Sequence, residues 1–281
     1  MLIEGAFFKL SDYFQSVESP SELYEAQVAF IFAVAIYQEL QNRGFPYLLP
    51  YIQFEKPYPI ESKRGKKPTV DIYFRIPKDK LPPEILHRWS ESGVCEENWI
   101  EVKFFGGAER KGSSEPKAQN VGAVLADLLR LKYYVREGGK YLLLVFNRKP
   151  EHYLAFTRGD SSRRDYLNAL LELGEHRVMI DLAKEPKTVL NTISKHFEKP
   201  LYQKIELNIL TYAIEPLLVK GLILLANLPL KRSREGFTSI EPAYYFYLIR
   251  IIEEVPELTT EKHRFEKHSY TYHHNVKTLF L

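Results

Sequence analysis

Apolar positions recur at helical spacing near the start of the chain. They run from Leu23 to Leu40, behind the helix-start sequence Ser19-Pro20-Ser21-Glu22, and Gly44 follows as a stop. This spacing predicts a helix over residues 23–42. Because the helix is apolar nearly all round, we expect it to pack on more than one side.

Segments rich in β-branched and aromatic residues follow this helix, and they predict strands at residues 51–58, 68–76 and 98–105. Between the last two, a polar insertion contains a short predicted helix near residues 84–90. Helical spacing then returns over residues 117–136, and residues 141–146 form a continuous apolar run typical of a buried strand. The order helix, three strands, helix, strand predicts a mixed sheet, and the last crossover implies at least one parallel pair.

The second half of the chain contains a less regular pattern. It predicts helices at 162–173 and 186–197, strands at 177–181 and around Ile205 to Ile209, and an aromatic helix at 241–254. We therefore expect the α/β class, with a mixed central β-sheet flanked by helices. Residues 1–150 would form the core, and residues 151–281 an elaborated C-terminal half that extends the same sheet or forms a small recognition lobe.

Composition narrows the class of protein. The 281 residues are 45% hydrophobic and carry a net charge of +3, so the chain can bury one large core or two modest ones. Cys95 is the single cysteine, which excludes an internal disulfide framework and a thiolate zinc cluster. No apolar run is long enough for a membrane span, and residues 1–10 do not resemble a secretory signal, so we expect a cytoplasmic protein without a membrane partner.

Charged residues interrupt two of the apolar strands. Asp71 lies in the segment 68–76, and Glu101-Val102-Lys103 lies in the segment 98–105. Alternate residues of a strand project to the same face, so Glu101 and Lys103 should be neighbours with Val102 turned away. If the two strands pair as a hairpin, Asp71 reaches the same edge, and the two carboxylates would repel each other unless a cation lies between them.

Mg²⁺ is the cation that this pattern favours, because it prefers oxygen ligands and retains waters that a substrate phosphate can replace. Mn²⁺ can substitute for it. Lys103 would place a positive charge beside the metal, where it can orient a water or stabilise charge on a phosphorane oxygen. The alternative interpretations have no catalytic meaning: a Glu/Lys pair on the exposed face of an edge strand, or a buried Glu101 to Lys103 ion pair. The apolar neighbours Trp99, Ile100, Phe104 and Phe105 favour the metal site, because isolated charges would be costly there.

Over roughly residues 20–147 these features resemble the PD-(D/E)xK nuclease superfamily, which has the restriction endonuclease-like fold. The resemblance implies that Asp71 and Glu101 hold the metal and that Lys103 assists the attacking water. It also implies that a glutamate of the first helix supports the metal shell; Glu25 is the matching position, and Glu22 is the competing one. Some members use a glutamine of the next helix, where Gln119 stands. The chain departs from the family motif because Pro68 precedes Asp71 by three residues rather than one.

A basic loop leads into the strand that carries Asp71. Its charged residues are Lys63, Arg64, Lys66 and Lys67. Such a loop either binds DNA backbone phosphates or is simply solvated. The C-terminal residues 262–277, which interleave histidines with aromatic rings, are open to a metal, a nucleic-acid or a purely structural interpretation.

Other catalytic motifs are missing from the sequence. There is no phosphate-binding P-loop, no dinucleotide fingerprint and no serine hydrolase elbow, so we expect no nucleotide cofactor. The sequence therefore predicts a Mg²⁺-dependent DNA endonuclease of restriction type, acting as a homodimer if it makes paired cuts. The alternatives are a resolvase, repair nuclease or exonuclease of the same superfamily, or a non-catalytic nucleic-acid-binding or assembly protein on the same fold.

Overall fold

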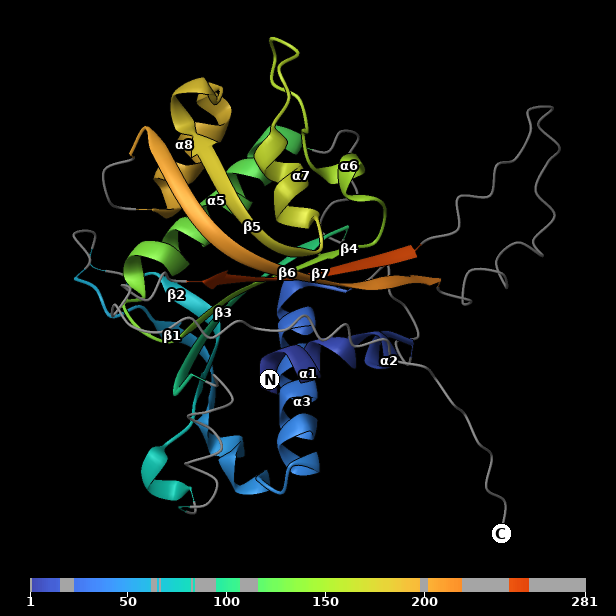
Figure 1. Ribbon diagram of the computed structural model, residues 1–281, viewed down its shortest axis with the longest axis vertical. Coiled ribbons are helices and arrows are strands. Elements are labelled where there is room, and N and C mark those ends of the chain that lie inside the picture. Colours follow the sequence, from blue (N-terminus) through green and yellow to red (C-terminus); the bar gives the residue numbers. More distant parts are fainter. Residues whose placement is uncertain are drawn as a thin grey trace, which may run out of the picture.

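A single mixed sheet of seven strands runs through the computed structural model (Figure 1). The structure describes residues 2–15, 23–61, 65, 67–81, 83, 95–106, 116–197, 202–218 and 243–252. The strands are β1 (Ile52–Pro57), β2 (Thr69–Arg75), β3 (Glu97–Phe105), β4 (Gly139–Phe146), β5 (Gly174–Asp181), β6 (Lys204–Leu218) and β7 (Ala243–Ile252). Their order is β1-β2-β3-β4-β7-β6-β5, so strands from both halves of the chain share one sheet.

The predicted parallel pair is β3 with β4, and the other neighbouring strands pair antiparallel. The connection from β3 to β4 passes through α5 (Lys117–Tyr134), as expected for a crossover between parallel strands. The α/β class and the mixed sheet flanked by helices are confirmed. None of the described helices is long and apolar enough to cross a membrane.

Helices cover both faces of the sheet (Figure 1). On one face lie α1 (Leu2–Phe8), α2 (Leu10–Gln15) and α3 (Glu25–Asn42). On the other face lie α5, α7 (Asp165–Leu171) and α8 (Lys187–His196), with the short α6 (Pro150–Tyr153) beside α5. Short 3₁₀ turns complete the described elements at η2 (Pro46–Tyr51), η3 (Lys78–Lys80) and η5 (Leu182–Lys184).

Helix α3 begins slightly later than predicted and ends where predicted. The backbone amide of Tyr24 donates to the side chain of Gln27 at 2.8 Å, which caps the first turn. The helix ends at Asn42, and Gly44 adopts the left-handed φ of 84° that favours glycine after a helix. As predicted, α3 packs on more than one side, against α1 and against the sheet. The start signal Ser19 to Glu22 lies outside the described residues.

Strand β7 overturns the prediction of an aromatic helix over residues 241–254. The strand lies between β4 and β6, and helices cover both of its faces. Tyr244, Phe246 and Leu248 face α1 to α3, whereas Ile249 and Ile251 belong to the opposite core. A strand buried on both faces lacks the alternation of apolar and polar residues, so its sequence cannot be told from that of a buried helix.

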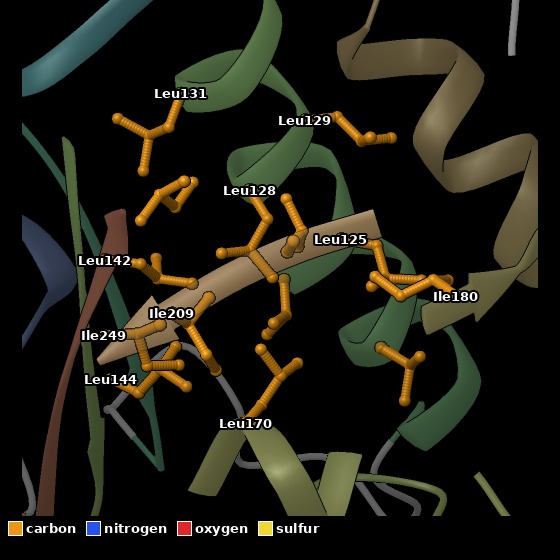
Figure 2. Close-up of a cluster of buried hydrophobic side chains, with 14 of the residues drawn as sticks. Leu125, Leu128, Leu129, Leu131, Leu142, Leu144, Leu170, Ile180, Ile209 and Ile249 are labelled. Carbon is orange, nitrogen blue, oxygen red and sulfur yellow. The ribbon is translucent and has the colours of Figure 1, made fainter. Parts of the chain in front are cut away.

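The larger of the two hydrophobic cores fills the space between the sheet and α5, α7 and α8 (Figure 2). Leu125, Leu128 and Leu129 of α5 belong to this core, as do Leu142 and Leu144 of β4. Helix α8 approaches α5 so closely that a Cβ atom on Gly122 would lie 2.7 Å from the Cβ of Thr192. This core places α5 over β4, the parallel neighbour of the strand that carries Glu101 and Lys103.

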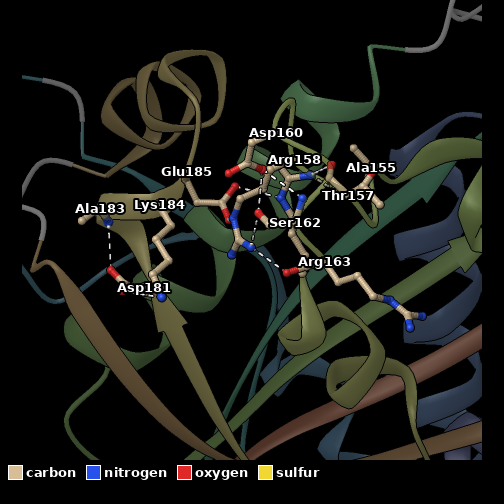
Figure 3. A network of polar contacts seen from close by, with 11 residues as sticks. Ala155, Thr157, Arg158, Asp160, Ser162, Arg163, Asp181, Ala183, Lys184 and Glu185 are labelled. Carbon is tan, nitrogen blue, oxygen red and sulfur yellow. Dashed lines mark hydrogen bonds and ion pairs between the residues drawn. The ribbon is translucent and has the colours of Figure 1, made fainter.

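A polar network joins the loop after α6 to the residues just before α8 (Figure 3). Arg158 and Arg164 donate from their Nε atoms to the two carboxylate oxygens of Glu185, at 3.0 and 2.8 Å. Arg164 is 1% exposed, so of the basic pair Arg163 and Arg164 only Arg163 faces solvent. The pair therefore contributes to the structure of this loop rather than forming a continuous basic surface.

Candidate functional site

Strands β2 and β3 separate at the position of Asp71. Their antiparallel pairing runs from Arg75 opposite Glu97 to Ile72 opposite Ile100 and goes no further. Beyond this point β3 continues to Phe105 with β4 alone as its partner. The backbone amides on the open edge of β3 therefore need acceptors other than the carbonyl groups of a neighbouring strand.

Two carboxylates supply those acceptors. Asp71 Oδ2 accepts a hydrogen bond from the amide of Val102 at 2.7 Å, and Glu25 Oε2 accepts one from the amide of Phe104 at 3.2 Å. Glu25 is the first residue of α3, so the helix start brings its side chain to the sheet. Asp71 and Glu25, which were predicted from separate elements, are thus both hydrogen-bonded to β3.

Glu101 and Lys103 point to the face of β3 that packs against α5. Trp99 and Phe105 share this face, whereas Ile100, Val102 and Phe104 belong to the opposite core. Lys103 Nζ lies 3.0 Å from Glu25 Oε1, which joins the lysine to the carboxylate that also holds β3. The structure therefore brings Glu25, Asp71, Glu101 and Lys103 together.

Helix α5 adds two residues that the sequence analysis did not single out. Asp127 Oδ2 lies 3.3 Å from Lys103 Nζ, and Arg130 donates from Nε to Glu101 Oε1 at 2.9 Å. Asp127 and Arg130 also pair with each other, at 2.6 Å. They form an i,i+3 pair of opposite charges within an apolar stretch of α5, and that pattern was a signal available from sequence. Gln119 lies about two turns closer to the helix start, so α5 reaches the site through other residues.

Tyr58 is the third residue that sequence reasoning missed. Its hydroxyl donates to Glu101 Oε1 at 2.5 Å, and its ring stacks on Trp99. The residue follows β1 directly and is 1% exposed. Tyr58 and Arg130 therefore engage the same oxygen of Glu101 from two sides, and Oε2 takes part in neither contact.

The charges of this cluster do not balance. Glu25, Asp71, Glu101 and Asp127 supply four carboxylates, whereas Lys103 and Arg130 supply two cations. Burial, together with the nearby charge of Asp127, raises the pKa of Glu101 to about 8. Burial likewise raises the pKa of Asp71, although Lys103 and the amide of Val102 oppose the shift. Ionised together, the four carboxylates would leave excess negative charge in a largely buried place, so without a further cation Glu101 holds a proton near neutral pH.

The positive charge on Lys103 is strongly favoured at this site. Burial alone would lower the pKa of its ammonium group, but Asp127 and then Glu25 raise it well above the usual range. Its side chain is 17% exposed, against 39% for Glu25 and 2% for Asp127. Lys103 is therefore a fixed cation at the partly open side of the cluster.

Asp71 and Glu101 are the residues of this cluster that could hold a divalent cation. Asp71 Oδ1 and Glu101 Oε2 take part in none of the contacts described above, and two positive charges would balance the excess. Within the described part of the chain, no three His, Cys, Asp or Glu side chains form a ready-made metal site. Two carboxylates suffice for Mg²⁺, however, because this ion keeps several waters and takes phosphate oxygens as further ligands.

The predicted phosphate-binding loop is only partly described. Lys67 is exposed and lies two residues before the start of β2, whereas Lys63, Arg64 and Lys66 lie outside the described residues. The predicted short helix near 84–90 and the histidine-rich residues 262–277 also lie outside them. Their predicted roles stay predictions.

Comparison of the chain with protein-family models, with curated proteins and with solved structures found no match. The resemblance to the PD-(D/E)xK nucleases accordingly depends on the residues and on the order of the elements.

Proposed function

We propose that this protein is a metal-dependent deoxyribonuclease that hydrolyses phosphodiester bonds in DNA. One observation supports this proposal above the others: Glu25 and Asp71 converge on the strand that carries Glu101 and Lys103, in a cluster whose carboxylates outnumber its cations. Excess buried negative charge is what a site for a divalent cation requires, and a DNA phosphate can complete the ligands of that cation.

In this proposal Asp71 and Glu101 hold Mg²⁺, and Mn²⁺ can replace it. The bound ion would polarise the scissile phosphate and lower the pKa of a water. Lys103 keeps its charge, so it orients that water and stabilises negative charge on the phosphate oxygens rather than removing a proton. Glu25 and Asp127 hold the ammonium group in place, and Arg130 with Tyr58 orients Glu101 through Oε1.

Cleavage of plasmid DNA tests the proposal. With Mg²⁺ or Mn²⁺ the wild type should convert supercoiled plasmid to nicked or linear product, and with a chelator it should produce none. Asp71→Asn keeps the shape of the side chain and removes its charge, so it should lower cleavage by about a hundredfold or more. The matched control is Asp79→Asn, since Asp79 is 75% exposed on η3. Equal cleavage by Asp71→Asn, or cleavage in the chelator, would contradict the proposal.

Within this class we favour a restriction-type endonuclease, because β5, β6 and β7 extend the sheet well beyond the strands that hold the cluster. A resolvase, a repair nuclease or an exonuclease would use the same chemistry. Mapping the ends of the products separates these cases: fixed internal cuts indicate the first, cuts at branches or lesions the next two, and release of terminal nucleotides the last. A cytoplasmic location belongs to the same proposal.

A second candidate function is DNA binding or assembly without cleavage. The observation in its favour is that Glu101 is 1% exposed and already bonded to Tyr58 and Arg130. Titration with Mn²⁺ separates the two functions. A metal site should raise the melting temperature as it fills, and Asp71→Ala should abolish the rise. DNA binding with no rise in melting temperature and no cleavage would favour the second function.

A further inference from the structure

Strand β5 lies at the opposite end of the sheet from β1 (Figure 1). Among the described strands, β6 is its only neighbour, and the eight residues of β5 include neither lysine nor proline. Proteins commonly place these residues on an edge strand to prevent it from pairing with another chain. The outer edge of β5 is therefore suited to pairing with a further strand.

The side chains of this edge have a distinctive order. Glu175, Arg177 and Met179 are exposed on one face of β5, and the exposed Leu173 directly precedes the strand. Leu173 is 64% exposed and Met179 is 52% exposed, whereas Val178 on the other face is buried in the core. Two large apolar side chains thus flank two side chains of opposite charge.

This order is complementary to itself. In an antiparallel pair of identical strands related by a two-fold axis at His176, residues equally far from His176 face each other. Glu175 then faces Arg177 of the second copy, and Leu173 faces Met179 of the second copy. Each contact occurs twice.

Neighbouring registers lack this match. In an antiparallel pair, residues that face each other point to the same side of the sheet. The two-fold axis between identical strands must therefore pass through a residue, and a change of register moves the axis to another residue. An axis at Arg177 or at Glu175 would place like charges opposite each other. An axis at Val178 would place Arg177 opposite Met179. Complementary charges and apolar contacts coincide only with the axis at His176.

The existing contact of Arg177 is compatible with this arrangement. Arg177 pairs with Glu206 of β6, and the two side chains are 67% and 36% exposed. An ion pair this exposed contributes little to stability. Glu175 of a second copy can therefore join this exposed ion pair.

We propose that two copies of this chain associate through the outer edge of β5, antiparallel and with the two-fold axis at His176. The resulting sheet runs continuously through both copies, and their two acidic clusters are related by the same axis. The interface depends on β5 alone and is independent of the proposed cleavage chemistry.

Charge reversal at the two facing positions tests the interface, with mass measured by sedimentation velocity over a wide range of protein concentration. The wild type should form dimers as concentration rises. Glu175→Arg would oppose arginines twice, and Arg177→Glu would oppose glutamates twice. Each variant should dimerise about a hundredfold more weakly than the wild type.

Mixing the two variants provides the decisive measurement. In a mixed dimer the two arginines of the Glu175→Arg copy would face the two glutamates of the Arg177→Glu copy, so dimers should reappear in the mixture alone. Asp79→Arg, an exposed reversal on η3, is the control and should dimerise like the wild type. Melting temperatures near that of the wild type would show that the variants fold.

A monomeric wild type at every concentration would overturn the proposal, and so would dimers that persist in both single variants or a mixture that stays monomeric. Because mass is measured rather than cleavage, a failure here leaves the proposed nuclease activity standing, and the reverse also holds.

Discussion

Arg130 of α5 and Glu101 of β3 form an ion pair of 2.9 Å in the interior, where their side chains are 12% and 1% exposed. The pair fastens the helix after β3 to the carboxylate that we propose as a metal ligand. Arg130 also contacts Asp127, which contacts Lys103. A change at one residue of α5 should therefore affect both charged residues of the Glu-x-Lys sequence.

Replacement of Arg130 by methionine should lower the free energy of unfolding by about 3–5 kcal/mol, because it leaves buried carboxylates without that cation. Urea denaturation in a chelator measures the loss. The control is Arg75→Met, since Arg75 pairs with Glu96 at the surface and is 53% exposed. That change should cost about 1 kcal/mol or less. Equal losses in both variants would show that the interior pair contributes no more than a surface one.

Stability should depend on pH through Glu101, whose pKa is about 8 in the folded protein. The folded state then holds a proton that the unfolded chain releases at lower pH. This contribution is complete below the ordinary pKa of a glutamate and is lost as pH rises towards 8. The raised pKa of Asp71 acts in the same direction. Melting temperatures from pH 5 to pH 8 in a chelator should therefore fall in the wild type and fall less in Glu101→Gln.

A divalent cation should reverse part of this trend. It binds the ionised carboxylates, so its stabilising effect should grow as pH rises and should be small below pH 5. The comparison uses the same pH series with saturating Mn²⁺. A metal effect that is constant across this range, or that survives in Glu101→Gln, would contradict the assignment of Glu101 as a ligand.

The network around Glu185 should have a structural role that is separate from the acidic cluster. Glu185→Gln leaves Arg158 and Arg164 without their shared negative charge, and Arg164 is fully buried. We expect a loss of about 3–5 kcal/mol in the free energy of unfolding. Hydrogen exchange should become faster at the amide of Arg164, which bonds to the carbonyl of Phe156. The exposed Glu172→Gln is the control and should change neither quantity.

Much of the fold followed from sequence because most elements have a clear period. The helix that became α3, the strands that became β1 to β4 and the crossover helix α5 were predicted within a few residues. The prediction for β7 was wrong because Tyr244 to Ile252 is almost uniformly apolar, a pattern that suits a buried helix and a strand buried on both faces equally. Helices α1 and α2 were not predicted, since residues 1–10 were considered only as a signal sequence and residues 11–15 received no assignment.

The part of the site that lies on neighbouring strands was predictable from the alternation of side chains along a strand. Period two places Glu101 beside Lys103, and a hairpin brings Asp71 near them. Residues from distant elements were harder, because no local period relates Tyr58 or Arg130 to Glu101. The partners of a buried carboxylate come from whichever helix or loop packs over it. For Asp127 and Arg130 the clue was a pair of opposite charges within an apolar stretch of helix.

The basic loop before β2 should bind DNA through phosphates alone. Lys67 lies four residues before Asp71, which corresponds to about 13 Å of extended chain, so the loop adjoins the cluster. Replacing Lys63, Arg64, Lys66 and Lys67 by alanine should weaken binding to all DNA sequences about equally. It should also reduce the slope of log affinity against log salt by about 0.9 for each phosphate that the loop no longer neutralises. Fluorescence anisotropy in a chelator measures both quantities without cleavage. Alanine at the exposed Lys78 and Lys80 is the control, and an unaltered salt slope with weaker binding at particular sequences would assign the loop to base recognition instead.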